Sequence, residues 1–254
     1  MKSIATYFLK SFFKVYFFKK YGKSQSNNKE ALSLLKYCNE FNIHKSFIEF
    51  GFEQFQFNCI ELTKSNFKGL LLDGNEKTCD IANEIFRKGK YNSKALSHWI
   101  DLDSLEPIKK FDSEINNKLG VLSVDIDGND YFILKELMKF ITPEIIIVEY
   151  NPSFVERNIS VPYKKDFVRH DEHQSGWYHG ASFNAFKSLL KKDYYLINNI
   201  DGLNLIFLHR SKAINSGYEL KKIKYKEGLL RNKWSGKNAN QQFEEISHLK
   251  YLEL

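Results

Sequence analysis

The sequence predicts a doubly wound α/β fold, in which a mostly parallel sheet with a C-terminal antiparallel hairpin is flanked by helices. From Ser46 onwards, short apolar runs alternate with helical patterns, which is typical of a parallel sheet covered on both faces. Four of the first five runs end in acidic or small residues, where open α/β sheets bind their ligands. The last two runs are joined at Asp201 and Gly202, which predicts a hairpin.

The five parallel strands are predicted from apolar runs that glycine or polar residues bound. These runs cover residues 46–51, 67–75, 94–102, 119–127 and 144–151. Helices are expected between them because apolar residues recur there at intervals of three and four; they cover residues 58–66, 76–89 and 130–140. A further helix over residues 181–192 precedes the hairpin, which occupies residues 194–210.

The chain of 254 residues divides into three parts by pattern. Residues 1–45 form an N-terminal helical extension, residues 46–211 the α/β domain, and residues 212–254 a basic tail that is also expected to be helical. Within the domain, residues 152–180 are polar and weakly periodic. An excursion of that length is usually functional, so this segment is expected to act as a lid or substrate loop.

The formal net charge of +7 is concentrated at the N-terminus. No acidic residue accompanies the lysines of this region, which are Lys2, Lys10, Lys14, Lys19, Lys20 and Lys23. The rest of the chain therefore carries only about +1, which is too little to attract a nucleic-acid backbone. No nucleic-acid partner is expected.

Residues 1–23 mix these lysines with aromatic residues. The lysines interrupt the apolar run that a ~20-residue membrane span needs, and no signal-peptide cleavage site follows. The segment is expected either to pack on the domain or on a second subunit, as in a homodimer, or to bind an anionic membrane surface. The three cysteines have neither disulfide nor metal-ligand spacing. They predict reduced thiols and therefore a cytoplasmic protein. A location at the inner face of the membrane agrees with this prediction.

Asp73 predicts a nucleoside site. It ends the second strand, ~20 residues after the glycine turn of the first, and is placed to accept hydrogen bonds from two ribose hydroxyls. A diphosphate would need a G-x-G-x-x-G turn, whereas Gly51 is followed by the bulky Phe52, Phe55 and Phe57. The nucleoside is therefore expected to lack a diphosphate.

These residues resemble a known family. Glu49-Phe-Gly51, Asp73-Gly-Asn75, the alternating units and the terminal hairpin are similar to class I S-adenosylmethionine-dependent methyltransferases, with their Rossmann-like sheet, over residues 47–210. "VDIDGNDY", "VEYN", "VPY" and "HGAS" resemble more narrowly the FkbM-like sugar O-methyltransferases of bacterial capsular polysaccharide gene clusters. The resemblance implies that these residues contact S-adenosylmethionine. Glu49 and Gly51 would contact the methionine part, Asp73 the ribose, and Asp101 and Leu102 would lie near the adenine. The same resemblance adds Gly74, Asn75 and Asp125 to the cofactor site.

Asp125, Asp127 and Asp130 follow the fourth strand in quick succession. Three like charges repel, so a cation or a shared proton is expected among them. The resemblance to O-methyltransferases implies a divalent cation between the fourth and fifth strands, with Asp125, Asp127, Glu149 and Asn151 as ligands. Such oxygen ligands suit Mg²⁺ or Mn²⁺, which would lower the pKa of an acceptor hydroxyl.

Without a metal, Asp127 or His179 would act as the general base. By the same resemblance, the expected acceptor is a sugar that is activated by a nucleotide. Two other functions remain open. Asp125 and Asp127 fit the short D-x-D motif of metal-dependent glycosyltransferases, and a non-catalytic binding protein could use the aromatic N-terminus alone.

Overall fold

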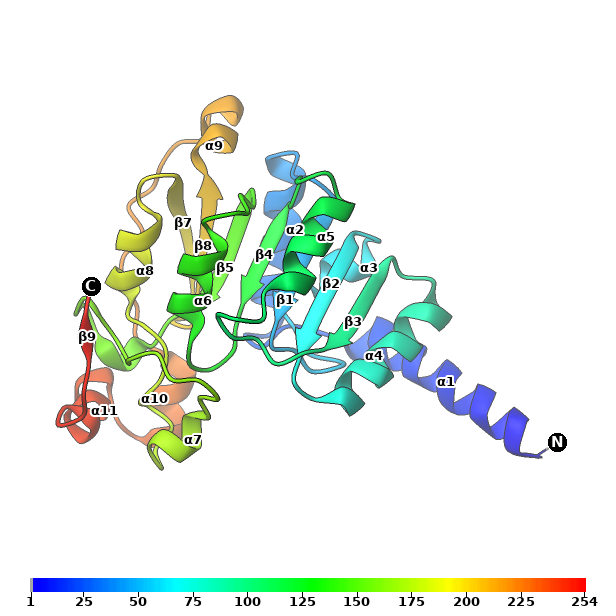
Figure 1. The fold of residues 1–254 in the computed structure, drawn as a ribbon, viewed down its shortest axis with the longest axis horizontal. Coiled ribbons are helices and arrows are strands. Elements are labelled where there is room, and N and C mark those ends of the chain that lie inside the picture. The colour runs from blue at the N-terminus through cyan, green and yellow to red at the C-terminus, as the bar shows by residue number, and fades with distance from the viewer. Residues whose placement is uncertain (1) are drawn as a thin grey trace.

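The computed structural model describes the backbone of residues 2–254 and the side chains from residue 12 onwards. Its centre is a seven-stranded sheet in the order β3-β2-β1-β4-β5-β8-β7 (Figure 1). These strands are β1 (Ser46–Phe50), β2 (Lys68–Asp73), β3 (Ser93–Ser97), β4 (Val121–Val124), β5 (Ile145–Glu149), β7 (Tyr194–Ile200) and β8 (Asn204–His209). Strands β1 to β5 run parallel, and β8 pairs antiparallel with β5 and with β7. The predicted doubly wound sheet with its antiparallel hairpin is confirmed.

The strand order reverses between β1 and β4. The chain first adds β2 and β3 on one side of β1 and then crosses to place β4 on the other side. Open α/β sheets bind their ligands at such a reversal, in the crevice outside the carboxyl ends of the strands. Every residue of β1, β4 and β5 is buried. Parallel strands buried on both faces have nearly continuous apolar sequences, and this is why the sequence reveals them.

One face of the sheet is covered by helices from the N-terminal half of the chain and one that follows the hairpin. They are α2 (Lys29–Glu40), α3 (Ile60–Lys64), α4 (Glu76–Gly89), α9 (Arg210–Ser216) and the end of α1 (Lys2–Tyr21). Cys79, Ala82 and Phe86 of α4 recur at helical spacing and are buried in this core, so the sequence pattern and the packing agree.

The other face is covered by α5 (Glu106–Glu114), α6 (Asp130–Leu137) and α8 (Phe183–Leu190). The helix α5 is not among those expected from the sequence. The strand before it, β3, also stops earlier than expected, at Ser97 rather than at residue 102. Ile108 and Phe111 fix α5 to the core, although the segment around them is mostly polar.

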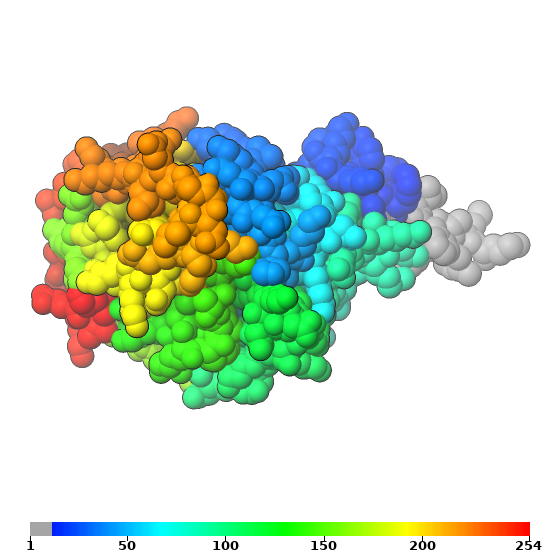
Figure 2. Space-filling view, turned by 90° about the horizontal axis from the view of Figure 1, so that it is seen from above, coloured from blue at the N-terminus to red at the C-terminus, as the bar shows by residue number. Residues whose placement is uncertain are grey.

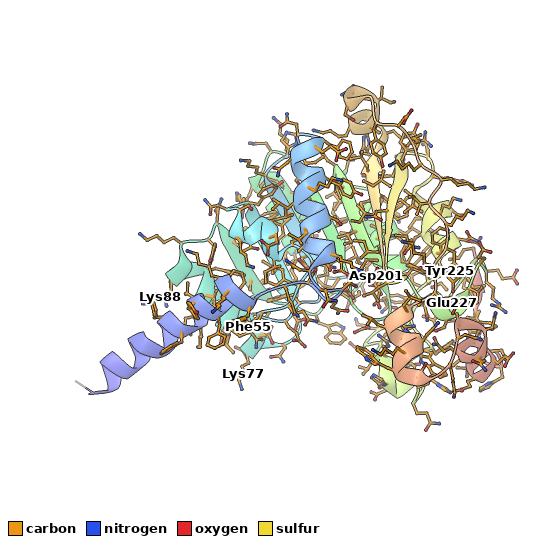
Figure 3. All side chains as sticks on the ribbon, turned by 180° about the vertical axis from the view of Figure 1, so that it is seen from behind. Phe55, Lys77, Lys88, Asp201, Tyr225 and Glu227 are labelled. Atoms are coloured by element: carbon orange, nitrogen blue, oxygen red, sulfur yellow. The ribbon has the colours of Figure 1, made fainter. Side chains whose placement is uncertain are left out.

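Residues 152–180 and the tail fold together beyond the carboxyl ends of the strands. Their elements are η1 (Pro152–Phe154), β6 (Ile159–Ser160), α7 (Arg169–Glu172), α10 (Leu229–Ser235), α11 (Ala239–Ile246) and β9 (Leu252–Glu253). Strands β6 and β9 pair antiparallel, and Phe154 and Ile246 share a small core. Glu227, labelled with Asp201 in Figure 3, lies at the hairpin turn, where its carbonyl oxygen would be 2.0 Å from a Cβ on Gly202. The segment before α10 therefore lies against the sheet.

The helix α1 lies at the opposite end of the molecule from the C-terminal residues (Figure 2). Phe18 is fully buried against Phe57 and Phe86, and Lys14 pairs with Glu84 at 2.6 Å. The prediction that this segment packs on the domain therefore holds for its last turns. The side chains of Lys2 and Lys10 lie outside the described residues. Among the described helices, none is both long enough and apolar enough to cross a membrane.

Candidate functional site

A cavity of about 530 Å³ opens at the strand-order reversal. Residues at the carboxyl ends of four parallel strands form its wall, together with Phe167 from the excursion. They include Gly51 after β1, Asp73, Gly74 and Asn75 at the end of β2, His98, Trp99 and Ile100 after β3, and Asp125, Ile126 and Asp127 after β4. The structure thus brings together Gly51, Asp73, Gly74, Asn75, Asp125 and Asp127 from the predicted cofactor and catalytic residues.

Gly51 allows the turn after β1 to touch the end of β4. Its φ is +69°, and a Cβ there would lie 1.7 Å from the carbonyl oxygen of Asp125. The backbone N–H of Gly51 donates to Leu72 in β2, and that of Asp125 donates to Phe50 in β1. Only glycine combines this conformation with so close an approach. It therefore sets the narrow distance between the two strand ends.

Asp73 faces the cavity with acceptor capacity to spare. Its Oδ1 accepts from the backbone N–H of Asn75 at 2.7 Å, and its Oδ2 accepts from that of Phe52 at 3.3 Å. Each carboxylate oxygen has a further lone pair that could accept a hydroxyl. Asn75 caps α4 by accepting from the N–H of Thr78. These bonds hold Asp73 between the loops after β1 and β2.

The third strand end differs from the prediction. The structure places Trp99, rather than Asp101 and Leu102, in the wall of the cavity. Because β3 ends at Ser97, Asp101 falls in a tight turn where its Oδ1 accepts from the N–H of Asp103. Trp99 lies over Gly74, where a Cβ would be 2.7 Å from its ring. An aromatic residue two positions after a strand was the available signal, because such rings stack on nucleobases.

Glu49 is fully buried behind a second cavity of about 230 Å³. Its two carboxylate oxygens accept from the backbone N–H groups of Asn58 and Cys59 at 2.6 and 2.7 Å. Burial raises its pKa to about 7, against the effect of these bonds. Glu49 thereby fixes the loop that follows Gly51. Its predicted contact with a methionine part stays a prediction.

The second cavity continues the first. The two share Gly51, Asp73, Asp125 and Asp127 in their walls. A third cavity, of about 400 Å³, lies beyond the second and has Gln25 in common with it. Its wall includes Glu149 at the end of β5. The three cavities together follow the carboxyl edge of the sheet from β3 to β5.

Two interactions relieve the carboxylate repulsion. The pKa of Asp125 is raised well above its ordinary value, first by burial and then by Glu149, with which it shares a side-chain hydrogen bond. Asp125 is therefore protonated more readily than a free aspartate. Asp130 instead accepts from the backbone N–H groups of Ile126 and Gly128, although burial still raises its pKa to about 6.

Two arginines supply the positive charge. Arg169 of α7 donates from Nη1 to Asp127, which is exposed and has a φ of +57°. Arg231 of α10 places Nη2 at 3.7 Å from Oε1 of Glu149 and donates from Nη1 to Asn151 at 2.9 Å. Both come from segments in which the sequence showed no strand-end pattern, so neither was predicted as a site residue.

Two of the four predicted metal ligands, Asp127 and Glu149, lie close together, but both have an arginine beside them. The donor atoms of Asp127, Glu149 and His179 lie within 4.8 Å of one another. However, Asp127 is paired with Arg169, and Arg231 lies next to both Glu149 and His179. A divalent cation would face two guanidinium groups at once.

Asn151 and Asp125 are also committed elsewhere. The side-chain oxygen of Asn151 accepts from Arg231 and from the backbone N–H of Ser153. Its amide donates to the carbonyl oxygens of Trp177 and His179. Asp125 lies close to Glu149, and burial followed by this neighbour raises its pKa. The set Asp125, Asp127, Glu149 and Asn151 therefore does not fit Mg²⁺ or Mn²⁺.

His179 is buried at the inner end of this cluster. Burial lowers its pKa well below the ordinary value, and Arg169 and Arg231 lower it further. Its Nε2 faces Arg231 at 3.5 Å, and its Nδ1 lies 3.3 Å from the amide nitrogen of Asn151. His179 is therefore a neutral imidazole within the predicted site.

Comparisons with known proteins give only remote likenesses. No known protein family matches the chain, and no curated protein does. Among solved structures, the N-terminal domain of EvdMO1 with S-adenosylhomocysteine bound has a TM-score of 0.46 at 12% identity, over 72% of this chain and 81% of that one. An S-adenosylmethionine-dependent methyltransferase from Clostridium acetobutylicum has a TM-score of 0.45 at 15% identity, over 71% and 91%. An O-methyltransferase from Bacillus cereus has 0.41 at 13%, over 71% and 80%.

Similarity at this level carries no argument about activity. The strand order, the parallel pairing of β1 to β5 and the antiparallel hairpin define the architecture by themselves. The chain has a Rossmann-like, doubly wound α/β fold.

Proposed function

We propose that the chain is an S-adenosylmethionine-dependent O-methyltransferase that acts on a hydroxyl of a sugar. The observation that carries this proposal is the continuous row of three cavities along the carboxyl edge of the sheet. Asp73 lies in the wall of the first and second cavities, and Glu149 lies in the wall of the third. This arrangement suits a nucleoside cofactor on one side of a carboxylate base and an acceptor on the other.

The chain's residues define how the cofactor would lie. The two oxygens of Asp73 would accept the ribose hydroxyls, and the ring of Trp99 would stack on the adenine. The second cavity, beside Gly51, would hold the methionine part. The turn after β1 has one glycine where a diphosphate cradle needs three, which favours this cofactor over a dinucleotide.

The cofactor supplies an electrophilic methyl group on a sulfonium, which an acceptor hydroxyl displaces with loss of its proton. Glu149 is the best placed group to take that proton, because it lines the acceptor cavity and lies close to Asp127 and His179. Burial, followed by repulsion from Asp127, raises its pKa to about 7, where a base is most effective near neutral pH.

Asp127 and His179, the bases predicted from the sequence, are less suited to this role. Asp127 is paired with Arg169, and the pKa of His179 is well below its ordinary value. A base with a low pKa accepts a proton weakly. We assign both to positioning Glu149 and the acceptor, which is most of what a displacement at a methyl group needs.

The sugar, its nucleotide activation and the role in capsular polysaccharide synthesis rest on the FkbM-like motifs. The third cavity supports the sugar, because Trp177 and Trp234 lie in its wall and the exposed ring of Trp234 could pack against a pyranose ring. The cysteines Cys38, Cys59 and Cys79 are free and buried. This fits the proposed location in the cytoplasm, at the inner face of the membrane.

A metal-dependent glycosyltransferase is less well supported. Its D-x-D acids would have to coordinate a cation on a diphosphate, yet Asp127 is paired with Arg169. Calorimetry with S-adenosylhomocysteine and with uridine diphosphate sugars separates the two functions. Binding of the sugar nucleotide that depends on Mn²⁺, without binding of S-adenosylhomocysteine, would favour the glycosyltransferase.

The Asp73→Ala variant tests the cofactor site. We expect it to bind S-adenosylhomocysteine more weakly by ~2 kcal/mol, or ~30-fold, because both ribose hydroxyls lose a charged acceptor. The measurement is isothermal titration calorimetry. Asp80→Ala is the control, since Asp80 is an exposed carboxylate of α4 that does not line the cavities. Equal affinity of the two variants would remove Asp73 from the site.

We also propose that α1 attaches the protein to an anionic membrane surface. Phe12, Phe13 and Phe17 are 70%, 54% and 49% exposed, and Lys19 and Lys20 lie on the same helix. Exposed aromatic residues beside lysines suit the interface of an anionic bilayer. A homodimer formed through this helix is the competing outcome.

A double variant, F13S/F17S, tests this attachment and keeps the buried Phe18. We expect about tenfold weaker flotation with phosphatidylserine vesicles, because two partly inserted rings are lost. The control is Phe140→Ser, which changes an exposed phenylalanine beyond α6. The alternative is that flotation is unchanged and that light scattering shows a wild-type dimer, which dissociates in the double variant. That result would assign α1 to a subunit interface.

A further inference from the structure

The third cavity has a composition that the proposed reaction does not explain. The charged groups in its wall are Glu149, Arg169 and Arg231, and Trp177 and Trp234 lie beside them. Methyl transfer to a neutral hydroxyl needs a base and a correctly placed hydroxyl oxygen. It does not need two guanidinium groups in one cavity.

The two arginines are held in place from outside the cavity. Arg169 donates from Nε to the carbonyl oxygen of Gly176 at 2.6 Å and from Nη1 to Asp127. Arg231 is anchored by Asn151 and by Ser153, to which its Nη1 donates at 2.9 and 3.3 Å. Within the described part of the chain, these contacts leave Nη2 of Arg169 and Nε of Arg231 as donors for a ligand.

The pairing of charges in the cavity changes during the proposed reaction. Asp127 pairs with Arg169, and Glu149 lies next to Arg231. When Glu149 takes the proton of the acceptor hydroxyl, one positive charge in the cavity loses its partner. Burial has already lowered the pKa of Arg231 to about 10, as expected for a cation that is short of compensation.

We propose that the acceptor carries an anionic group, phosphate or carboxylate, which Arg169 and Arg231 bind while its sugar ring lies against Trp234. Guanidinium groups bind both anions in a bidentate way. Trp234 is 82% exposed on α10, one turn from Arg231, and so lies at the open side of the cavity. The two sources of the anion are the phosphate of an activated sugar and the carboxylate of an acidic sugar. This inference rests on the proposed function, since it specifies the acceptor of that reaction.

The test compares three probes by calorimetry, with and without saturating S-adenosylhomocysteine. They are methyl glucoside, which is neutral, glucuronate, which has a carboxylate, and glucose 1-phosphate. We expect at least one anionic probe to bind about tenfold more tightly than methyl glucoside, as charged hydrogen bonds predict. The tighter of the two anionic probes identifies the source of the negative group.

Arg169→Gln and Arg231→Gln should each remove about tenfold of that preference and leave the binding of methyl glucoside unchanged. Arg87→Gln is the matched control, because Arg87 is exposed on α4 and does not line the third cavity. Thermal unfolding and S-adenosylhomocysteine affinity show whether each variant is folded. The comparison of the three probes on the wild-type protein does not depend on the folding of any variant.

Equal affinity of wild-type protein for the neutral and anionic probes overturns this inference, as does a preference that survives in both arginine variants. If S-adenosylhomocysteine itself does not bind to the wild-type protein, the proposed function fails instead. The two failures are therefore distinguishable.

Discussion

Replacing Gly51 by alanine is expected to destabilise the protein by ~3 kcal/mol or more and to abolish cofactor binding. The new Cβ would lie 1.7 Å from the carbonyl oxygen of Asp125, and backbone at that distance has to move. A left-handed conformation adds ~1 kcal/mol for a residue with a Cβ. The movement would separate the ends of β1 and β4, on which the cofactor cavities depend. Urea unfolding and calorimetry with S-adenosylhomocysteine measure the two effects.

Gly217→Ala is the matched control for Gly51→Ala. Gly217 has nearly the same φ, +66°, but a Cβ there would meet nothing within 4 Å. We expect this control to lose only the ~1 kcal/mol of the left-handed conformation and to keep its affinity for S-adenosylhomocysteine. If the two variants are equally stable and bind equally well, the close approach of β1 and β4 has no role in the site.

Glu149→Gln is expected to lower the rate of methyl transfer by ~10³-fold, since a positioned general base contributes ~10² to 10⁴. Glutamine keeps the shape of the side chain but cannot take the hydroxyl proton. In the wild-type protein, kcat should rise with pH through about 7, because Glu149 accepts a proton only when it is ionised, and burial raises its pKa to that value. The variant should lose this dependence and retain its affinity for S-adenosylhomocysteine. Mass spectrometry of the methylated sugar follows the reaction.

The same assay tests the role of a metal. Glu136→Gln is the control for Glu149→Gln, because Glu136 of α6 forms a surface pair with Lys139. With Arg169 and Arg231 as the positive partners of the carboxylates, we expect wild-type activity to survive EDTA. Loss of activity in EDTA, with recovery on addition of Mg²⁺ or Mn²⁺, would restore the metal hypothesis and make Glu149 a ligand instead of the base.

The sequence alone determined the sheet and the positions of its strand ends. The strands β1, β4 and β5 are buried on both faces, so each has an apolar run that can be recognised without knowing its neighbours. Because these strands are parallel, the residue that follows each run lies at the carboxyl edge of the sheet. Gly51, Asp73 and Asp125 could therefore be predicted as neighbours, and the structure places all three in one cavity wall.

Two local features of the structure differ from the prediction, namely the end of β3 and the helix α5. The third strand has a mostly exposed pattern, with a buried residue only at Ala95, so its end could not be located from burial. The prediction for that strand end consequently fell on Asp101 and Leu102 instead of Trp99. The helix α5 was missed because few of its residues are apolar.

Tertiary structure alone decided how the carboxylates are compensated. Arg169 and Asp127 are 42 positions apart in the chain, and Arg231 reaches Glu149 from the tail, which showed only a basic helical pattern. Local periodicity reports which side of an element is buried, and it carries no information about which distant side chain arrives there. The acids at the strand ends are compatible with a cation, a shared proton or arginines. The folding of residues 152–180 against the tail brought in the arginines. Phe167 and Trp177, which flank α7, share a core with Ile246 of α11, and Gln242 of α11 donates to Asn232 of α10.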